Sequence, residues 1–434
     1  ATLGKAEPAA KIDIYIPDRA SEGYGLKKSA LKNLANKGAK LIITVDNATR
    51  NVDEVAYAKT LGLDIIITDH HEPGDILPNC LIINPKIGGE TYPFLGLAGC
   101  GVAFKVAQAL LTSPLTPLLK KGEGKEPRSN AGRRGEVFLK WLLDLVAIGT
   151  IADLVPLIDE NRVLTKYGLV VLNKTKRVGL KKLIAVARSG VDKNGQNREI
   201  DSWQVGFQLA PRLNAAGRLD HANSAYELLV TADEVEADKI AKQLNATNQE
   251  RQRLTEEIFQ YADTQVNQAD KILLAVEPGL RCHCEKSRVA RDDEAIPSSM
   301  EIKTGLPRSP LNALALMSGS LAMTEQVWPA GVMGLVAGKL TEKYYRPALA
   351  ITDKNGLASA SDGLRRSEEI VGSGRSIAEF DITAMLEECA EFLANFGGHK
   401  QACGFTLKSR EMLEPFLAKA KEIAAAKLTG IELS

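Results

Sequence analysis

The chain has 434 residues, enough for about three domains at roughly 150 residues each. Its hydrophobic fraction of 44% and charged fraction of 25% are ordinary, and they exclude a mainly disordered chain, a collagen-like chain and a disulfide miniprotein. It carries 55 basic and 54 acidic residues, so any nucleic-acid binding must come from local patches rather than from the net charge of +1. No apolar run approaches the roughly 20 residues of a membrane helix, and we expect no membrane association.

Two features predict a cytoplasmic protein. Residues 1–11 lack the apolar core of a secretory signal. The six cysteines are scattered, and Cys100, Cys389 and Cys403 have apolar or small neighbours, which is typical of free thiols in a reducing compartment.

The first part of the chain alternates strand patterns with helix patterns. Ile12, Ile14 and Ile16 occupy alternate positions, as in a strand with one buried face. The apolar runs 41–45, 65–67 and 81–83 are typical of strands covered on both faces. This alternation predicts an α/β fold with a parallel sheet and right-handed crossovers. The expected helices span about 26–37, 51–61, 99–111, 137–150 and 163–172.

A long amphipathic pattern lies near the middle of the chain. Between about 233 and 266, Ile240, Leu244 and Ile258 recur at helical spacing among polar residues. A helix of this length between two apolar regions usually joins domains. The chain that follows, up to a helical pattern over about 410–427, is again mixed α/β.

These patterns predict a domain organisation. We expect a first domain over 1–232, a connecting helix over 233–268, and a second, smaller mixed α/β domain over 269–427. Three polar segments without apolar periodicity interrupt this order and are predicted to be inserted loops. They span 113–135, 280–322 and 355–370.

Two strands of the expected sheet end in acidic and imidazole side chains. Asp46 follows the run 41–45, and Asp69, His70 and His71 follow the next strand. Ligands bind at the carboxyl ends of strands in an open parallel sheet, so these groups should meet at one edge. Carboxylates with one imidazole suit Mn²⁺ or Mg²⁺ better than zinc. The alternatives are a helix N-cap for Asp69 and structural histidines, but two adjacent histidines among only five favour a site.

Other polar residues of the first domain have two interpretations each. Asp153 ends an apolar run and is either a cap for the next segment or another metal ligand, because burying it unpaired would be costly. Arg212, Asn214 and Arg218 stand among small residues, where the backbone can approach a ligand and guanidinium groups suit phosphate. A salt-bridged turn is the alternative for that segment.

Two glycine-rich strings occur in the second domain. Residues 372–376 read Gly-Ser-Gly-Arg-Ser, and residues 397–399 read Gly-Gly-His. Backbone N–H groups, hydroxyls and an arginine can together form a phosphate cradle. Ordinary turns are the default interpretation of each string taken alone.

Five strings, taken in order, resemble the motifs of one family. Their order and spacing are similar to those of the DHH phosphoesterase superfamily, and within it to the RecJ-type single-stranded-DNA exonucleases. Residues 16–19, 23–26 and 328–332 favour this type over the shorter oligoribonuclease and pyrophosphatase branches. The five strings span residues 44–46, 68–71, 149–153, 211–218 and 397–399, and they end at Asp46, His71, Asp153, Arg218 and His399.

This resemblance implies a DHH domain joined to a DHH-associated domain, with a two-metal site for phosphodiester hydrolysis. Asp46 would bridge two Mn²⁺ or Mg²⁺ ions, His70 would ligate one of them, and Asp153 would complete that site. Asp69 and His71 would orient these ligands or contact the scissile phosphate.

The resemblance also implies contacts with nucleic acid. Arg212, Asn214 and Arg218 would stabilise phosphate charge during catalysis. A pocket for a 5′ terminal phosphate would set the direction of cleavage, and the glycine-rich string near the C-terminus would bind the strand. The residues expected to bind nucleic acid in this way are Arg19, Tyr24, Ser373, Arg375, Gly397, Gly398 and His399.

RecJ-type relatives carry an earlier strand ending in Asp-x-Asp, and they continue into an OB-fold that grips single strands. Neither feature is found in this sequence, so we expect a chain truncated at both ends. The implied function is 5′→3′ exonuclease activity on single-stranded DNA in repair and recombination, with single-strand-binding protein and a helicase as partners. The alternatives are an oligoribonuclease or cyclic-dinucleotide phosphodiesterase of the same superfamily, and a catalytically inactive nucleic-acid-binding relative.

Overall fold

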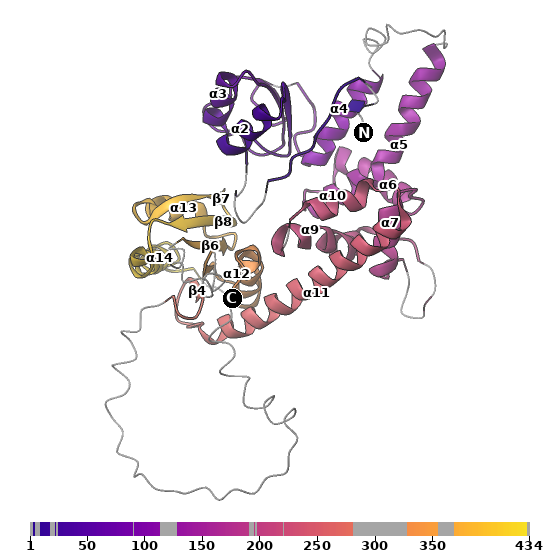
Figure 1. Ribbon diagram of the computed structural model, residues 1–434. Helices are drawn as coiled ribbons and strands as arrows, with labels where there is room; N and C mark the ends of the chain where they lie inside the picture. Colours follow the sequence, from indigo (N-terminus) through magenta and orange to yellow (C-terminus); the bar gives the residue numbers. More distant parts are fainter. Residues whose placement is uncertain are drawn as a thin grey trace, which may run out of the picture. The chain divides into compact units, whose positions relative to one another are not determined.

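The computed structural model describes residues 3–4, 9–17, 22, 25–89, 91–112, 128–190, 195, 198–219, 221–280, 328–354 and 369–431, with backbone only for 128–134. The chain forms two compact units, Ala1–Gln249 and Glu250–Ser434 (Figure 1). The boundary lies inside the long helix α11 (Glu234–Thr264). None of the helices in these ranges is both long and apolar enough to cross a membrane.

The first unit contains a parallel sheet of three strands. The strand order is β1 (Leu41–Val45), β2 (Asp64–Thr68) and β3 (Leu81–Ile83). Val45 and Ile83 both lie opposite Thr68, so the three strands end at the same level. This sheet confirms the predicted α/β fold, and it brings the residues that follow each strand to one edge.

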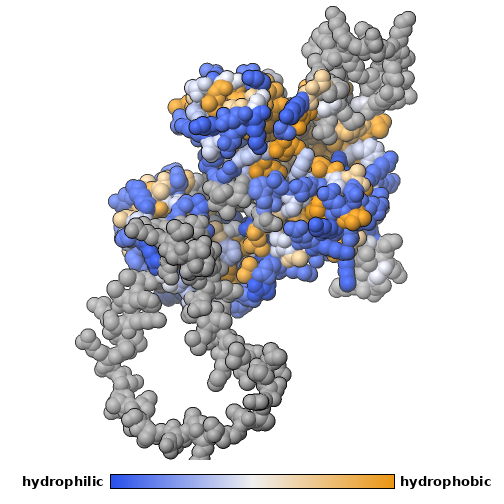
Figure 2. All heavy atoms as spheres, in the orientation of Figure 1, coloured by the Kyte–Doolittle hydropathy of each residue, from blue (hydrophilic) through white to orange (hydrophobic). Residues whose placement is uncertain are grey.

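Helices cover both faces of this sheet. Side chains alternate along β2, and Ile65 and Ile67 pack with α2 (Lys28–Asn36) and α3 (Val52–Thr60). Helix α2 buries Ala30 and Leu31, and Figure 2 shows polar residues, drawn blue, over its outer side. On the other face, Ile83 packs with Leu97, which precedes α4 (Gly99–Thr112), and with Val102 in its first turns.

The rest of the first unit is helical. Helices α5 and α6 pack against each other (Figure 1). A separate apolar core joins α5 to the helices that follow it. The elements are α4 (Gly99–Thr112), α5 (Arg128–Ala152), α6 (Asp159–Leu172), α7 (Val178–Val186), α8 (Ser202–Gln204), the π-helical η2 (Val205–Leu209), α9 (Ala210–Leu219), α10 (Asn223–Val230) and the first part of α11.

The second unit contains a mixed sheet of five strands in the order β4-β5-β6-β8-β7. Strand β4 pairs in parallel with β5, and the other neighbours are antiparallel. A separate mixed sheet agrees with the expected mixed α/β second domain. The strands are β4 (Leu273–Val276), β5 (Ala348–Asp353), β6 (Ile370–Arg375), β7 (Leu393–His399) and β8 (Ala402–Leu407).

Helices lie on both faces of this second sheet. Helix α12 (Ala330–Tyr344) packs on β5 and β6. The opposite face forms an apolar core with α13 (Ile382–Glu388) and α14 (Leu413–Lys427), in which Phe405 and Phe416 meet. The short helices η6 (Ala390–Phe392) and η7 (Arg410–Met412) complete this unit.

One expected strand is not found. Residues 10–17 have no regular secondary structure, and Ile12 and Ile14 are 41% and 56% exposed. Alternation shows which side of a segment could be buried, but a strand also needs a hydrogen-bonded neighbour. In the described part of the chain, no strand pairs with these residues.

The loop predicted over 113–135 overlaps a helix at its C-terminal end. Helix α5 begins at Arg128, directly after Pro127, and residues 113–127 lie outside the described residues. A Cβ at Gly135 would lie 3.0 Å from the Leu111 carbonyl oxygen, so this glycine allows close packing of α5. The expected loop 355–370 likewise ends in β6, and residues 281–327 and 355–368 are outside the described ranges.

Candidate functional site

Asp46 follows β1 directly, in a conformation that few residues adopt. Its φ is +64°, and its backbone N–H donates to the Thr68 carbonyl at 2.8 Å. A left-handed backbone costs free energy for a residue other than glycine, and such residues cluster at functional sites. Gly99 begins α4 beside it, and a Cβ at that position would lie 2.2 Å from Asp46 Oδ1. The carboxylate therefore lies directly against the helix backbone.

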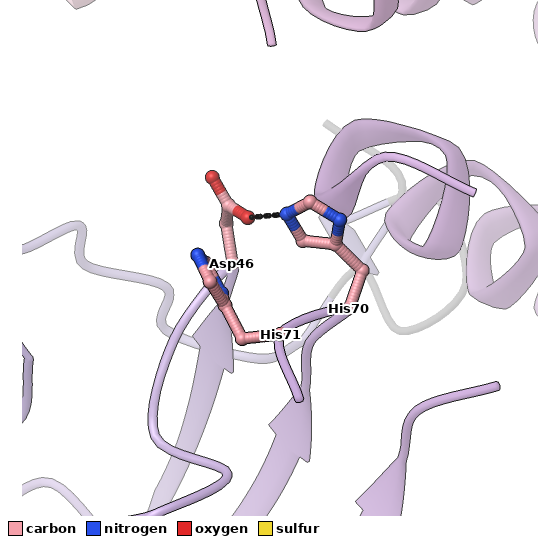
Figure 3. A group of neighbouring side chains, drawn as sticks. All are labelled: Asp46, His70 and His71. Carbon is pink, nitrogen blue, oxygen red and sulfur yellow. Dashed lines mark ion pairs between the residues drawn. The ribbon is translucent and has the colours of Figure 1, made fainter. Parts of the chain in front are cut away.

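His70 is the centre of the cluster. It follows β2, is only 8% exposed, and its Nε2 lies 3.0 Å from Asp46 Oδ1 (Figure 3). The same nitrogen lies 3.4 Å from Oδ2 of Asp153, which follows the end of α5. The structure therefore brings together three groups that are far apart in the sequence. His71 also belongs to this group, because one ligand atom from each of Asp46, His70 and His71 lies within 4.8 Å of the other two.

The donor atoms of this cluster suit a divalent cation. In the described part of the chain, Asp46 Oδ1 and His70 Nε2 are buried atoms without a hydrogen-bond partner, although they face each other. Burial raises the pKa of Asp153, and the nearby Asp46 carboxylate adds to this rise. A bound cation would satisfy both unpaired atoms and relieve the repulsion between the two carboxylates. Carboxylate oxygen with imidazole nitrogen is a donor set that Mn²⁺ and Mg²⁺ accept.

Asp69 holds the histidines in place and does not face this group itself. It is 1% exposed, and it accepts hydrogen bonds from the Thr49 N–H (3.1 Å), the Thr49 hydroxyl (2.7 Å) and the His70 N–H (2.8 Å). Burial alone would raise the pKa of Asp69, but the hydrogen bonds from His71 and Thr49 lower it well below its ordinary value. This carboxyl is therefore ionised.

His71 is oriented by the same carboxylate. Its Nδ1 lies 2.7 Å from Asp69 Oδ1, and an ionised carboxylate can only accept, so Nδ1 carries the proton. This hydrogen bond raises the pKa of His71 above its ordinary value. The interaction fixes the ring, whose centroid lies 4.6 Å from that of His70.

Three residues that support this cluster were not predicted from the sequence. Thr49 and Gly99 are described above. Asn84, which is 2% exposed, donates to the Thr49 hydroxyl at 3.1 Å and to the His71 carbonyl at 2.9 Å. A signal for Asn84 was present, because it follows β3 as Asp46 follows β1.

The segment with Arg212, Asn214 and Arg218 is a helix, so its interpretation as a turn was wrong. Small residues such as Ala215 and Ala216 are buried in α9 and form helices well, which explains the difference. Asn214 and Arg218 are four residues apart and share one helix face. Arg212 is held by hydrogen bonds to Asn245 Oδ1 (2.9 Å) and the Gln208 carbonyl (2.6 Å), and burial lowers its pKa.

In the second unit, strand register aligns the predicted phosphate-binding residues. Ser373 and Gly397 both lie opposite Gly404 of β8. Arg375 and His399 both lie opposite Ala402. Side chains at opposed positions share a sheet face, so all of these residues lie on the face opposite the apolar core.

This face, which we call the glycine face, is defined by Ser373, Arg375, Gly397, His399 and Gly404. Its β7 part is open, since a Cβ at Gly397 would meet nothing within 4 Å, whereas α12 packs on its β6 part. The guanidinium of Arg375 donates to the Gly374 carbonyl at 2.8 Å and lies against Gly334 of α12, where a Cβ would be 3.0 Å from it. A ligand can therefore approach both the backbone and a positioned arginine.

The remaining predicted residues are placed as follows. Gly398 lies in β7 with φ +148°, and a Cβ there would be 2.3 Å from the Ala402 carbonyl oxygen, so glycine is required. Arg19 and Tyr24 lie outside the described residues.

Comparisons with known proteins show the family to which the chain belongs. The model of the DHH family, N-terminal domain, matches residues 2–150, and the model of the DHHA1 domain matches residues 317–426. A single-stranded-DNA-specific exonuclease RecJ from Bacillus subtilis (strain 168) is 39% identical over 424 residues, which is 97% of this chain. The chain is a RecJ-type member of the DHH superfamily.

Further RecJ-type relatives are similar over almost the whole chain. The Salmonella typhimurium exonuclease RecJ is 34% identical over 98% of the chain, and the Escherichia coli one is 32% identical over 98%. The chain spans only 43% of the Bacillus relative and 65% of each of the other two.

Two solved RecJ structures share the fold. One, described as exonuclease RecJ bound to manganese, has a TM-score of 0.65 and 26% identity, and the match covers 96% of this chain and 84% of that one. The other, RecJ from Thermus thermophilus in complex with Mn²⁺, also has a TM-score of 0.65 and 26% identity, with 92% and 47% covered.

Proposed function

We propose that this chain is the core of a metal-dependent exonuclease that hydrolyses phosphodiester bonds of single-stranded DNA. The observation that carries this proposal is the approach of Asp46 Oδ1 and Asp153 Oδ2 to His70 Nε2, at 3.0 Å and 3.4 Å. The printed names of the relatives support the substrate class, since they are called single-stranded-DNA-specific exonucleases. The manganese-bound neighbours support the metal requirement.

Asp46, His70 and Asp153 would hold Mn²⁺ or Mg²⁺, and His71 offers a further ligand atom to the same group. When bound, such ions activate water as a nucleophile and stabilise the charge on the leaving oxygen. By family resemblance we propose two ions, with Asp46 between them.

The protein supplies the positioning. Asp69 accepts the His71 Nδ1–H and so fixes the ring, whose other nitrogen would ligate a metal ion or contact the scissile phosphate. Asn214 and Arg218, on one face of α9, would stabilise charge on the phosphate. Arg212, near the start of the same helix, would assist them.

The glycine face would bind the DNA strand. Its open backbone at Gly397 and the guanidinium of Arg375 can contact phosphates without reading bases, which suits a substrate of any sequence. The direction of cleavage is a separate proposal. We propose that Ser373, Arg375 and Arg19 hold a 5′ terminal phosphate and so impose 5′→3′ direction. Tyr24, Gly398 and His399 would contact the following nucleotides.

The cellular role follows from this activity. We propose that the chain acts on DNA in repair and recombination, in the cytoplasm, with single-strand-binding protein and a helicase supplying its substrate. The described cysteines Cys80, Cys100, Cys389 and Cys403 are free thiols, which suits a reducing compartment.

The test compares labelled substrates in the presence of Mn²⁺. We expect single-stranded DNA labelled at the 5′ end to release its label first, and duplex DNA to be resistant. Asp46→Ala should abolish cleavage, whereas Asp64→Ala, at the opposite end of the same sheet, should not.

Two outcomes would replace the proposal by its alternatives. Faster cleavage of very short RNA than of long single-stranded DNA would identify an oligoribonuclease. Tight binding of single-stranded DNA without cleavage would identify an inactive relative.

A further inference from the structure

Two aromatic side chains of the first unit are exposed and have no role in the site described above. Trp203 is 58% exposed and Phe207 is 67% exposed, although aromatic side chains of this size are usually mostly buried. Their ring centroids lie 5.4 Å apart and their planes meet at 30°, so the rings stack on each other. The chain therefore presents a preformed pair of aromatic faces to solvent.

The local helix structure fixes this pair. Asp201 begins α8 with a capping box, in which its carboxylate accepts from the Gln204 N–H (3.0 Å) and Gln204 Oε1 accepts from the Asp201 N–H (2.9 Å). Helix α8 continues into the π-helical turn η2, where Val205 and Leu209 are buried. Trp203 and Phe207 are four residues apart on the opposite, outer face. A π-helical turn is rare and frequently marks a functional position.

The turn that carries Phe207 packs against the helix that precedes Asp153, one of the residues proposed to bind metal. Gly206 precedes Phe207, and a Cβ at Gly206 would lie 3.6 Å from Ile151 Cγ2. Ile151 stands two residues before Asp153, so the turn that carries Phe207 packs against the end of α5 that carries Asp153. Leu154, with φ +58°, is 87% exposed at the same helix end.

The surroundings favour a flat, charged ligand over an apolar protein surface. Ser202, beside Trp203, is exposed and polar, and Gln208, beside Phe207, is half-buried and accepts a hydrogen bond from the Ser189 hydroxyl. A protein interface usually needs a contiguous apolar patch of several hundred Å². Arg212 stands one turn further along the same helical segment. An aromatic face with an arginine nearby is the arrangement that binds single-stranded nucleic acid without base preference.

We propose that Trp203 and Phe207 form a stacking platform for nucleobases of the bound single strand, beside the metal cluster. The proposal rests on the proposed function, because it names how that site holds its substrate. Every base has an aromatic face, so the platform accepts any sequence, and it would keep the strand extended next to Asp153.

The test measures binding without cleavage. A fluorescently labelled short oligothymidylate, and an abasic oligonucleotide of equal length, are titrated in EDTA and followed by anisotropy. We expect the unsubstituted chain to prefer oligothymidylate, and Trp203→Ala or Phe207→Ala to weaken its binding roughly 5- to 100-fold while changing abasic binding little. Trp203→Phe should restore most of the affinity, and Val235→Ala, which truncates an 81% exposed side chain elsewhere in this unit, should have no effect.

The other outcomes of this test decide separately on the stacking platform and on the exonuclease proposal. Equal losses on both oligonucleotides, or no loss on either, would overturn the platform, and so would an unsubstituted chain that binds both equally. If the unsubstituted chain cleaves single-stranded DNA and these variants bind normally, only the platform fails. If it does not cleave but shows the base-dependent loss, the platform stands and the exonuclease proposal fails.

Discussion

The cluster around His70 and the glycine face around Arg375 differ most in how their residues are exposed. Asp69 and His70 are 1% and 8% exposed, and each is held by a residue of the segment that follows β1, Thr49 for Asp69 and Asp46 for His70. The glycine face ends in an edge strand whose residues 397–399 are all exposed. A group that holds a metal needs fixed geometry, whereas a surface that binds any strand needs an accessible backbone. The two regions should therefore respond differently to substitution.

The sharpest way to break the metal cluster alone is Gly99→Ala. The new Cβ would lie 2.2 Å from Asp46 Oδ1, so the carboxylate must move. We expect Mn²⁺ affinity and nuclease activity to fall by roughly 100-fold. This is the upper end of the losses seen when the residues that position a metal ligand are disturbed. Gly88→Ala is the matched control, because a Cβ there meets nothing within 4 Å. Calorimetry and circular dichroism together separate this effect from unfolding.

A smaller disturbance of the same cluster is Asp69→Asn. The variant keeps the shape of the side chain but removes the charge that accepts the His71 Nδ1–H. We expect kcat/KM to fall roughly 10- to 100-fold. Asp53→Asn, on an exposed position of α3, should leave it unchanged. Full activity of Asp69→Asn would show that the orientation of His71 does not matter.

The glycine face is tested by Arg375→Ala. If its guanidinium binds a terminal phosphate, the variant should lose preference for 5′-phosphorylated over 5′-hydroxyl strands by roughly five- to tenfold, about the contribution of one hydrogen bond. Mn²⁺ binding should not change. Lys419→Ala on α14 is the control cation. Equal binding of both end types by the unsubstituted chain would refute this role.

The smallest expected effect on activity comes from Thr49→Val. It removes the hydroxyl that donates to Asp69 and accepts from Asn84, which leaves two buried groups with fewer partners. We expect a loss of about 1–3 kcal/mol in the free energy of unfolding, measured by denaturant, with activity reduced only a few-fold. A variant as stable as the unsubstituted chain would show that this network contributes little.

The sequence predicted the edge at which the metal cluster lies, because apolar runs identified β1 and β2 and their carboxyl ends must coincide in a parallel sheet. Sequence patterns could not identify Thr49 or Gly99 as parts of the site. Their roles depend on hydrogen bonds and close approaches between segments about 20 and 50 residues apart, which leave no local pattern.

The same limit explains the errors in the fold. The alternation of Ile12, Ile14 and Ile16 is a genuine strand pattern, but pairing depends on a neighbouring strand that no local pattern reveals. Trp203 and Phe207 have no sequence signal that marks them as exposed, because aromatic residues at helical spacing usually belong to the core. Only the structure shows that they face outward.

The most direct test of the central claim is titration of Mn²⁺ into the chain by calorimetry. We predict weak binding to the unsubstituted chain and to Asp64→Ala, and its loss in Asp46→Ala and in His70→Ala, because on this proposal Oδ1 and Nε2 of these side chains, which lie 3.0 Å apart, would hold one ion. Unchanged Mn²⁺ affinity in both Asp46→Ala and His70→Ala would contradict the assignment of this cluster as the metal site.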